Sequence, residues 1–355
     1  MQAEIEAEEI ADQAAFGVDH FDVAVLIPCF NEATTIGKTV QAFRKAVPLA
    51  RVYVFDNNSH DSTAEIAAGA GAIVRHEAVQ GKGNVVRRMF ADIDADIYII
   101  VDGDGTYDAK ATPRLLKTLA SGPYDMVNAA RKHIAQEVYR PGHIFGNRVL
   151  TGLVGLFFGA KTTDLLSGYK ALSRRFVKTF PAMSTGFEIE TELMIHALDL
   201  RLPFAEIEAP YYARPEGSTS KLSTLRDGLR ILKLLGWLLK HEKPLLFFSI
   251  LAGLLGMLSV GLGIPIVLEF LATGLVPRLP TAVLATAIML SAIMSLFTGL
   301  ILDTVTRSRR EAKRLHYLRE PAPRMAACQA SRLLTAKDHG EFGRDPPTCT
   351  PTALT

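Results

Sequence analysis

One short segment constrains the fold more than any other. Residues 97–101 are apolar and mostly β-branched, and they lead directly into the acidic turn Asp102-Gly103-Asp104. A run of this length and composition predicts a buried β-strand. Open α/β sheets bind their ligands at the carboxyl ends of the strands, where these two carboxylates would lie. Carboxylates placed there suit a hard divalent cation that also holds substrate phosphates, while a solvated Asp-Gly turn is the simpler interpretation of this motif alone.

The first hundred residues alternate between strand-like and helix-like segments. Predicted strands cover 23–27, 51–55, 72–75 and 97–101, and predicted helices cover 34–46, 62–70 and 83–92. This alternation predicts a Rossmann-like α/β fold, in which a mainly parallel sheet carries helices on both faces. The carboxyl ends of the parallel strands would then lie together at one end of the sheet.

Polar residues collect at that carboxyl end. Asn31 and Glu32 follow the first strand, and Asp56 ends the second. Because like charges repel at short range, such a cluster, together with the Asp-Gly-Asp turn, predicts a cation or ligand that compensates it. Dinucleotide-binding and P-loop interpretations lack their defining glycine patterns. Residues 81–84 (GKGN) place a lysine at a helix start where a phosphate would fit, and an ordinary loop explains them equally well.

Composition narrows the class of protein. The 355 residues suffice for one large domain and a smaller part, and a net charge of +2 gives no reason to expect a nucleic-acid partner. Cys29, Cys328 and Cys349 show no metal spacing and cannot all pair, which predicts a reducing compartment. Residues 1–20 form an acidic extension without Lys or Arg and lack the pattern of a secretory signal.

Two apolar segments lie toward the C-terminus. We expect transmembrane helices at about 244–271 and 279–303, each long enough to cross a hydrocarbon core of roughly 30 Å. Basic residues flank the pair: Lys233, Lys240 and Lys243 precede it, and Arg307, Arg309, Arg310, Lys313 and Arg314 follow it. By the positive-inside rule, the N-terminal domain and both termini face the cytoplasm of a multi-pass protein of the inner (plasma) membrane.

The remaining segments complete the predicted organisation. The domain is expected at 21–221, and residues 222–243 repeat leucines at helical spacing beside basic residues, which predicts an amphipathic helix on an anionic leaflet. Packing of that helix on the domain is the alternative. Residues 306–355 begin basic and then lose periodicity, which predicts a disordered cytoplasmic tail. Small residues of the first span, among them Gly253 and Gly256, leave a homo-oligomer open.

Six short motifs follow one another along the predicted domain. They are IPCFNE at 27–32, DNNSHDST at 56–63, DGD at 102–104, NAAR at 128–131, TDLLSGY at 163–169 and RPEGSTSK at 214–221. Together they resemble the nucleotide-sugar core of family 2 glycosyltransferases with a GT-A fold. Their order is similar to the branch of dolichol-phosphate mannose synthases and polyprenyl-phosphate glucosyltransferases. The resemblance covers residues 22–222, and the combined pattern is specific although no single piece is.

The resemblance implies a donor site for a nucleotide-sugar. By match to the loop after the first strand and the acid after the second, the nucleoside would contact Pro28, Phe30, Glu32 and Asp56. The second of these motifs commonly reads Asp-Asp-Gly-Ser in the family. Here Asn57 replaces the second carboxylate, so Asp56 is the important charge.

The D-x-D motif implies a Mg²⁺ or Mn²⁺ cofactor. Asp102 and Gly103 match the part near the ribose or metal, and Asp104 matches the direct metal ligand. Family members often carry glutamine where this chain has Thr106. The metal shell would therefore be completed by the Thr106 hydroxyl, by water or by Asp108.

The later motifs imply an acceptor site. In the family, matching residues clamp phosphate oxygens or contact substrate; here they are Arg131, Arg148, Ser167, Arg214, Ser220 and Lys221. Bidentate guanidinium contacts suit a diphosphate and an incoming lipid phosphate equally. Asp164 is a candidate polar group on the acceptor side, and a loop residue that caps local backbone donors is the alternative.

The implied reaction is inverting transfer of a hexose from a UDP- or GDP-sugar to a polyprenyl phosphate held in the lipid bilayer. A phosphate oxygen is already anionic at neutral pH, so catalysis would come from positioning and charge stabilisation without a strong general base. Another lipid acceptor, such as diacylglycerol, would need a base, for which Glu188, Glu190 and Glu192 are candidates. A non-catalytic membrane scaffold is disfavoured by the presence of Asp56 and the D-x-D motif.

Overall fold

The structure is a computed structural model that describes residues 21–133, 152, 155, 162–186, 188–213, 236, 240 and 243–321. The acidic extension at 1–20, nearly all of the predicted amphipathic helix at 222–243 and the tail beyond 321 lie outside these ranges.

A seven-stranded sheet forms the centre of the domain, in the order β3-β2-β1-β4-β6-β5-β7. The strands are β1 (Val23–Cys29), β2 (Arg51–Asp56), β3 (Ile73–His76), β4 (Ile97–Ile100), β5 (Met126–His133), β6 (Lys170–Ser173) and β7 (Phe204–Tyr211). β6 is antiparallel to both of its neighbours, and the other four pairs are parallel. The expected mainly parallel sheet is confirmed.

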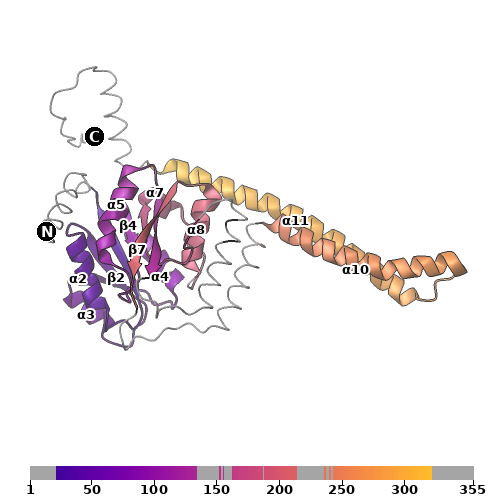
Figure 1. Cartoon of the computed structure of the whole chain (residues 1–355), viewed down its shortest axis with the longest axis horizontal. Coiled ribbons are helices and arrows are strands. Elements are labelled where there is room, and N and C mark those ends of the chain that lie inside the picture. The colour runs from indigo at the N-terminus through magenta and orange to yellow at the C-terminus, as the bar shows by residue number, and fades with distance from the viewer. Residues whose placement is uncertain are drawn as a thin grey trace, which may run out of the picture.

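Helices cover both faces of this sheet (Figure 1). On one face lie α2 (Ile36–Ala46), α3 (Thr63–Gly69), the short 3-10 helix η2 (Ala109–Ala111) and α5 (Thr112–Ser121). On the other lie α4 (Lys82–Asp92), α7 (Arg174–Thr179) and α8 (Ile189–Leu200). The apolar spacing of α2 explains its placement, since Ile36, Val40 and Phe43 share one helical face and are all buried against the sheet.

Strand β4 explains why the sequence before the Asp-Gly-Asp turn is apolar without interruption. It lies between β1 and β6, and all four of its residues are buried. Ile97 and Ile99 belong to one core, and Tyr98 and Ile100 to the other. A strand covered on both faces needs apolar side chains at every position. Its last residue pairs with Leu26 of β1, so the acidic turn emerges beside the loop that follows β1.

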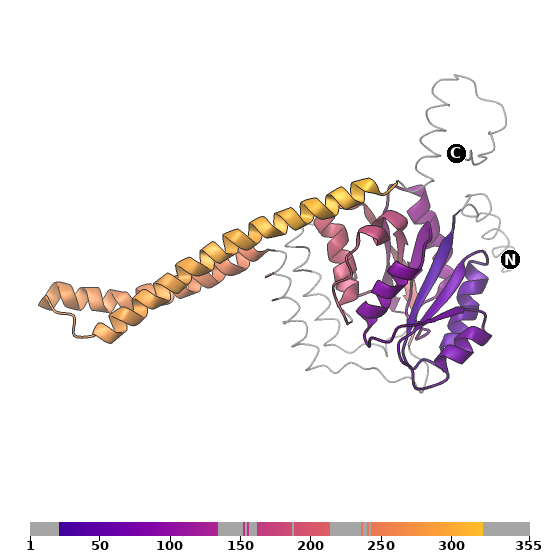
Figure 2. The ribbon, with the colours of Figure 1, turned by 180° about the vertical axis from the view of Figure 1, so that it is seen from behind.

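Two long helices form a hairpin that extends from the domain (Figure 2). They are α10 (Pro244–Thr273) and α11 (Leu279–Arg319), and both are long and apolar enough to cross a membrane. Ser259 Oγ donates to the Ala285 carbonyl at 2.7 Å, and a Cβ on Gly299 would lie 2.9 Å from Phe248. The α10 glycines that left a homo-oligomer open have no atom within 4 Å of where a Cβ would stand, so they do not mediate this contact.

The far end of α11 returns to the domain instead of ending near residue 303 (Figure 1). Arg310 pairs with Asp199 of α8, and Lys313 Nζ lies 3.8 Å from the same carboxylate. Tyr317 donates to Asp125 Oδ2 at 2.7 Å while Arg175 stacks 4.2 Å over its ring. The basic residues at 307–314 are therefore part of a helix that is docked on the domain and continues beyond the span expected at 279–303. The buried acids at 125 and 199 supply the physical reason, because burial requires that they be paired.

Candidate functional site

The polar strand ends predicted from the sequence lie together. β1 lies between β2 and β4 in the sheet, and all three are parallel. The loop after β1, the carboxylate of Asp56 and the turn at 102–104 therefore share the carboxyl end of the sheet. Thr35 joins two of these parts, since its hydroxyl lies close to Glu32 and donates to the Gly103 carbonyl at 2.9 Å.

Asp56 has the environment of a ligand-binding acid. Its side chain is buried, and Oδ2 accepts the Ser59 N–H at 3.3 Å and lies 3.4 Å from His76 Nδ1. Oδ1 is buried without a hydrogen-bond partner among the described residues. A buried acceptor left without a donor is costly, so the position suits a ligand that supplies an N–H group. Half-buried Pro28 and Phe30 stand on the neighbouring strand end.

The acidic turn is tightly constrained. A Cβ on Gly103 would lie 2.5 Å from Cys29 Sγ, so a side chain at this position would have to displace the buried Cys29 side chain. Asp104 is buried, and its Oδ1 accepts the Thr106 N–H at 3.1 Å and the Thr106 hydroxyl at 2.6 Å. Thr106 therefore orients the Asp104 carboxylate. Asp108, the other alternative for the metal shell, caps η2 by accepting the Lys110 N–H at 3.0 Å.

Lys82 neutralises part of this charge. Its ammonium pairs with both Asp102 and Glu190, and the three side chains come from α4, the acidic turn and α8. Burial lowers the pKa of Lys82, but the two carboxylates outweigh it and raise the pKa above its ordinary value. The lysine of the GKGN segment thus contacts the D-x-D motif directly. In the sequence, the position of Lys82 at a helix start indicated a phosphate site. The contact between Lys82 and Asp102 is visible only in the fold.

The acidic turn fits a divalent cation that is shared with a substrate. Asp102 and Asp104 supply oxygen ligands, the type that Mg²⁺ and Mn²⁺ prefer. Among the residues that the structure describes, no group of three or more His, Cys, Asp or Glu side chains is arranged to hold a metal. Mg²⁺ typically uses one or two carboxylates plus phosphate oxygens, and two carboxylates at a strand end match that arrangement.

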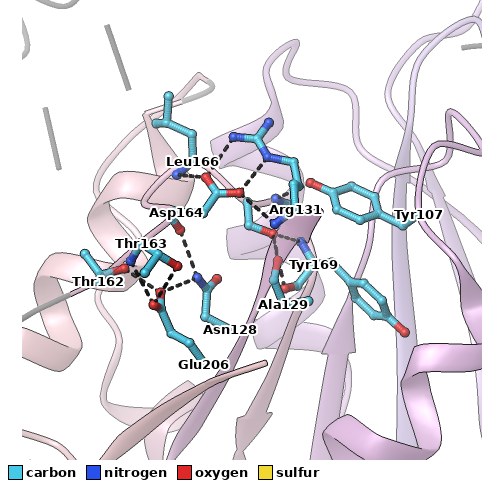
Figure 3. A network of polar contacts seen from close by, with 12 residues as sticks. Tyr107, Asn128, Ala129, Arg131, Thr162, Thr163, Asp164, Leu166, Tyr169 and Glu206 are labelled. Carbon is cyan, nitrogen blue, oxygen red and sulfur yellow. Dashed lines mark hydrogen bonds and ion pairs between the residues drawn. The ribbon is translucent and has the colours of Figure 1, made fainter. Parts of the chain in front are cut away.

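A second polar cluster surrounds Asp164 and Arg131 (Figure 3). Arg131 Nε and Nη2 donate to the two Asp164 oxygens at 2.7 and 2.8 Å, a bidentate pair. Burial raises the pKa of Asp164, but the bonds from Arg131 outweigh it and hold the pKa below its ordinary value. Ser167 is buried, and its hydroxyl donates to the Ala129 carbonyl at 2.6 Å. Ser167 therefore supports the backbone of β5 two residues before Arg131.

Several predicted residues cannot be placed. Arg148, Arg214, Ser220 and Lys221 lie outside the described residues. The predicted phosphate clamp is therefore represented here by Arg131 alone.

Two charged residues, buried Lys170 and half-buried Glu206, were missed by the sequence interpretation. Lys170 opens β6, and burial lowers its pKa to about 8 against the opposing effect of Asp164, Glu190 and Glu206. Lys170 lies in a strand whose four residues are all buried. Lysine is rarely buried unpaired, so a lysine in such a strand was a usable signal of a buried polar cluster. Glu206 accepts hydrogen bonds from Asn128 and Thr162. No sequence pattern distinguished it from exposed Glu208 two residues later.

Comparison with known proteins identifies the family. The family described as Glycosyl transferase family 2 matches residues 24–180. Glycosyltransferase AglJ of Haloferax volcanii is 32% identical over 295 residues, which cover 81% of this chain and 95% of that protein. Protein RfbJ of Shigella flexneri is 52% identical over 124 residues, which cover 35% of this chain and 96% of that protein. The chain belongs to glycosyltransferase family 2, and this membership supports glycosyltransferase activity.

Solved structures agree with the fold. Glucosyl-3-phosphoglycerate synthase from Mycobacterium tuberculosis, in complex with Mn²⁺, UDP and glucosyl-3-phosphoglycerate, aligns with a TM-score of 0.53 and 22% identity. The alignment covers 65% of this chain and 83% of that structure. The same enzyme has also been crystallised with Mg²⁺ and UDP. The expected GT-A fold is confirmed.

Proposed function

We propose that this protein is a metal-dependent, inverting glycosyltransferase that moves a hexose from a UDP- or GDP-sugar to a polyprenyl phosphate at the cytoplasmic surface of the inner membrane. One observation carries the proposal. A family 2 site rich in carboxylates is joined, in the same chain, to two helices long and apolar enough to span a membrane.

The donor would bind along the carboxyl end of the sheet. Asp56 Oδ1 is a buried acceptor that an N–H of the nucleobase would satisfy. Asp104, oriented by Thr106, would hold Mg²⁺ or Mn²⁺ together with Asp102. The bound cation would neutralise the charge that develops on the departing nucleoside diphosphate. The Mn²⁺ and UDP bound by the M. tuberculosis synthase support this assignment.

The acceptor would be an anion that needs no general base. Arg131 remains charged, since the hydrogen bonds and charge of Asp164 raise its pKa above the ordinary value despite burial. Asp164 fixes the plane of the guanidinium, and the clamp would orient the phosphate oxygen for attack at the sugar carbon. Inversion follows from a single direct displacement.

The described acids do not favour a hydroxyl acceptor. Glu190 is held by Lys82, and Glu192 accepts the N–H groups of Met183 and Ser184 at 2.9 and 2.7 Å. His196 is packed between Phe176 and Phe180, and burial lowers its pKa to about 3. Exposed Glu188 is the described residue of the alternative set that lacks such a structural role. The competing hypothesis, with diacylglycerol as the acceptor, would therefore have to use Glu188 as its general base.

The test is transfer by the full-length protein in detergent. We would supply undecaprenyl phosphate, Mn²⁺ or Mg²⁺, and a panel of radiolabelled UDP- and GDP-sugars. One donor should label the lipid, and chelation of the metal should abolish the product. Asp104→Ala should lower transfer by about 10³-fold, as expected when several kcal/mol of charge stabilisation at the transition state is lost.

Asp92→Asn is the matched control, because Asp92 forms a surface pair with Arg88 on α4 away from the acidic turn. Label in diacylglycerol but not in the polyprenyl phosphate would refute the proposed acceptor. Equal transfer by Asp104→Ala and the wild type would refute the proposed metal site.

A further inference from the structure

We propose that Glu206 is a positioning residue that holds the Asp164–Arg131 pair in the orientation required by the acceptor phosphate. This inference rests on the proposed function for its kinetic consequences, whereas its structural consequence can be measured without any activity. Glu206 itself contacts neither the acidic turn nor Arg131 in the described bonds; it acts through the segment that carries Asp164.

Glu206 is a half-buried residue of β7, beside Asn128 in the register of β5 and β7. Its carboxylate accepts four hydrogen bonds (Figure 3). Oε1 accepts Asn128 Nδ2 at 2.9 Å and the Thr162 hydroxyl at 2.5 Å. Oε2 accepts the Thr163 N–H at 2.8 Å and the Thr163 hydroxyl at 3.0 Å. One side chain thus anchors the two residues that immediately precede Asp164.

Asn128 completes the attachment from the adjacent strand. Its fully buried amide also donates to the Asp164 carbonyl at 2.8 Å, and its Oδ1 accepts from Lys170. The segment at 162–168 has no helix or strand of its own. Its geometry therefore depends on these side-chain bonds instead of a backbone ladder.

The anchored segment delivers Asp164 to Arg131. Besides the bidentate pair, Asp164 Oδ2 accepts the Arg131 N–H at 3.1 Å, and Oδ1 accepts the Leu166 N–H at 3.3 Å. A shift of the segment would move the carboxylate and, with it, the plane of the guanidinium. Small displacements of this kind reduce catalysis strongly, because the reacting groups must be held close to their attack geometry.

Charge balance gives Glu206 a second role. Lys170 lies beside Asn128, so the buried cluster contains the cations Arg131 and Lys170 and the anions Asp164 and Glu206. Neutralising Glu206 would remove one of the three carboxylates that offset the burial of Lys170 and would leave Asp164 and Glu190. In Glu206→Gln, the side-chain NH₂ group could replace the carboxylate oxygen that now accepts the Thr163 N–H. Two hydrogen-bond donors would then face each other. We therefore expect Glu206→Gln to release the Asp164 segment without opening the core.

The first measurement is independent of activity. Full-length wild type and Glu206→Gln would be treated with phenylglyoxal, and modification of Arg131 would be followed by peptide mass spectrometry. We expect Arg131 to react several-fold faster in Glu206→Gln, because its bidentate partner is displaced. Glu208→Gln is the control, since exposed Glu208 on the same strand pairs only with Lys132 in the described ion pairs. Unchanged Arg131 reactivity in Glu206→Gln would overturn the proposal even if no transfer were detected.

The second measurement is kinetic. Glu206→Gln should lower kcat/KM for the lipid acceptor by about 10-fold and leave the donor KM within about twofold, because the displaced groups face the acceptor. Thr162→Val, which is isosteric and removes one of the four bonds, should act in the same direction with a smaller effect. An equal loss in the donor and acceptor constants would indicate a general structural defect and would overturn the positioning role.

A double-mutant cycle connects the two residues. If Glu206 acts through Asp164, then Glu206→Gln should add little to the loss caused by Asp164→Asn. Additive losses would overturn the proposal. Absence of transfer in the wild type would count against the proposed function alone, and the Arg131 modification would still decide the role of Glu206.

Discussion

Two buried aspartates at opposite ends of the sheet differ in how they are satisfied. Asp125 precedes β5 at the amino end, where α11 docks, and its oxygens accept bonds from Ser173, Arg175 and Tyr317 between 2.7 and 3.2 Å. Asp56 closes β2 at the carboxyl end, and its Oδ1 has no partner among the described residues. The two residues are 0% and 4% exposed, so burial does not distinguish them.

The difference separates Asp125, which is satisfied within the fold, from Asp56, which keeps an oxygen that the nucleobase would satisfy in the proposed function. A buried carboxylate with four donors contributes to stability through its partners, and removal leaves those partners unpaired. A buried carboxylate with an unsatisfied oxygen carries a cost in the free protein that only a bound donor relieves. Variants at the two ends should therefore separate stability from substrate binding.

The largest effect on stability is expected at Asp125. Asp125→Ala would leave the half-buried guanidinium of Arg175 without its carboxylate and would remove the acceptor of Tyr317. We expect the free energy of unfolding to fall by about 3 kcal/mol, with kcat per folded molecule unchanged. Thermal unfolding and transfer assays on the same preparation would measure both. A loss of kcat without a loss of stability would show that Asp125 acts in catalysis and not in folding.

An opposite pattern is expected at Asp56. Asp56→Asn should raise the donor KM by about 10-fold, because a hydrogen bond to a charged acceptor becomes a weaker neutral one. The midpoint of thermal unfolding should stay the same or rise, since the variant removes a buried charge with an unsatisfied oxygen. Isothermal titration with the nucleoside diphosphate would follow binding directly. A fall in the midpoint similar to that of Asp125→Ala would assign Asp56 a structural role.

The smallest effect is expected where α11 meets Asp125. Tyr317→Phe keeps the ring under Arg175 and removes only the hydroxyl bond to the carboxylate. The free energy of unfolding should fall by about 1 kcal/mol, the usual contribution of one such bond. Chemical denaturation of the wild type and variant in the same detergent would measure it. No change would show that Ser173 and Arg175 satisfy Asp125 without the docked helix.

Much of the carboxyl end of the sheet was predictable from sequence. Strand composition located β1, β2 and β4, and parallel topology then required Glu32, Asp56 and Asp104 to lie together. These inferences succeed because each uses a short local pattern and one general rule about where strands end. The two helices of the hairpin were predictable for the same reason, since an apolar run of sufficient length is a local property.

The amino end was not predictable, because its contacts join residues far apart in the chain. The basic run at 307–314, which lies within α11, predicted only the side of a membrane that it would face, and that rule depends only on charge. Nothing in the run shows that Arg310 meets Asp199, or that Tyr317 meets Asp125, 192 residues earlier. The pairing of Lys82 with Asp102 and the bonds of Glu206 are long-range contacts of the same kind.

The docking of α11 has a consequence for how this protein can be divided. A soluble fragment that ends with the predicted domain at residue 221 would lack Arg310, Lys313 and Tyr317. It would lose both ion pairs to Asp199 and the hydroxyl bond to Asp125. It would also uncover the apolar cluster against which Tyr317 packs. The boundary expected at 221 therefore excludes a segment that contacts the domain, and a fragment for solution work should retain 306–319, supplied in trans or joined by a linker in place of the hairpin.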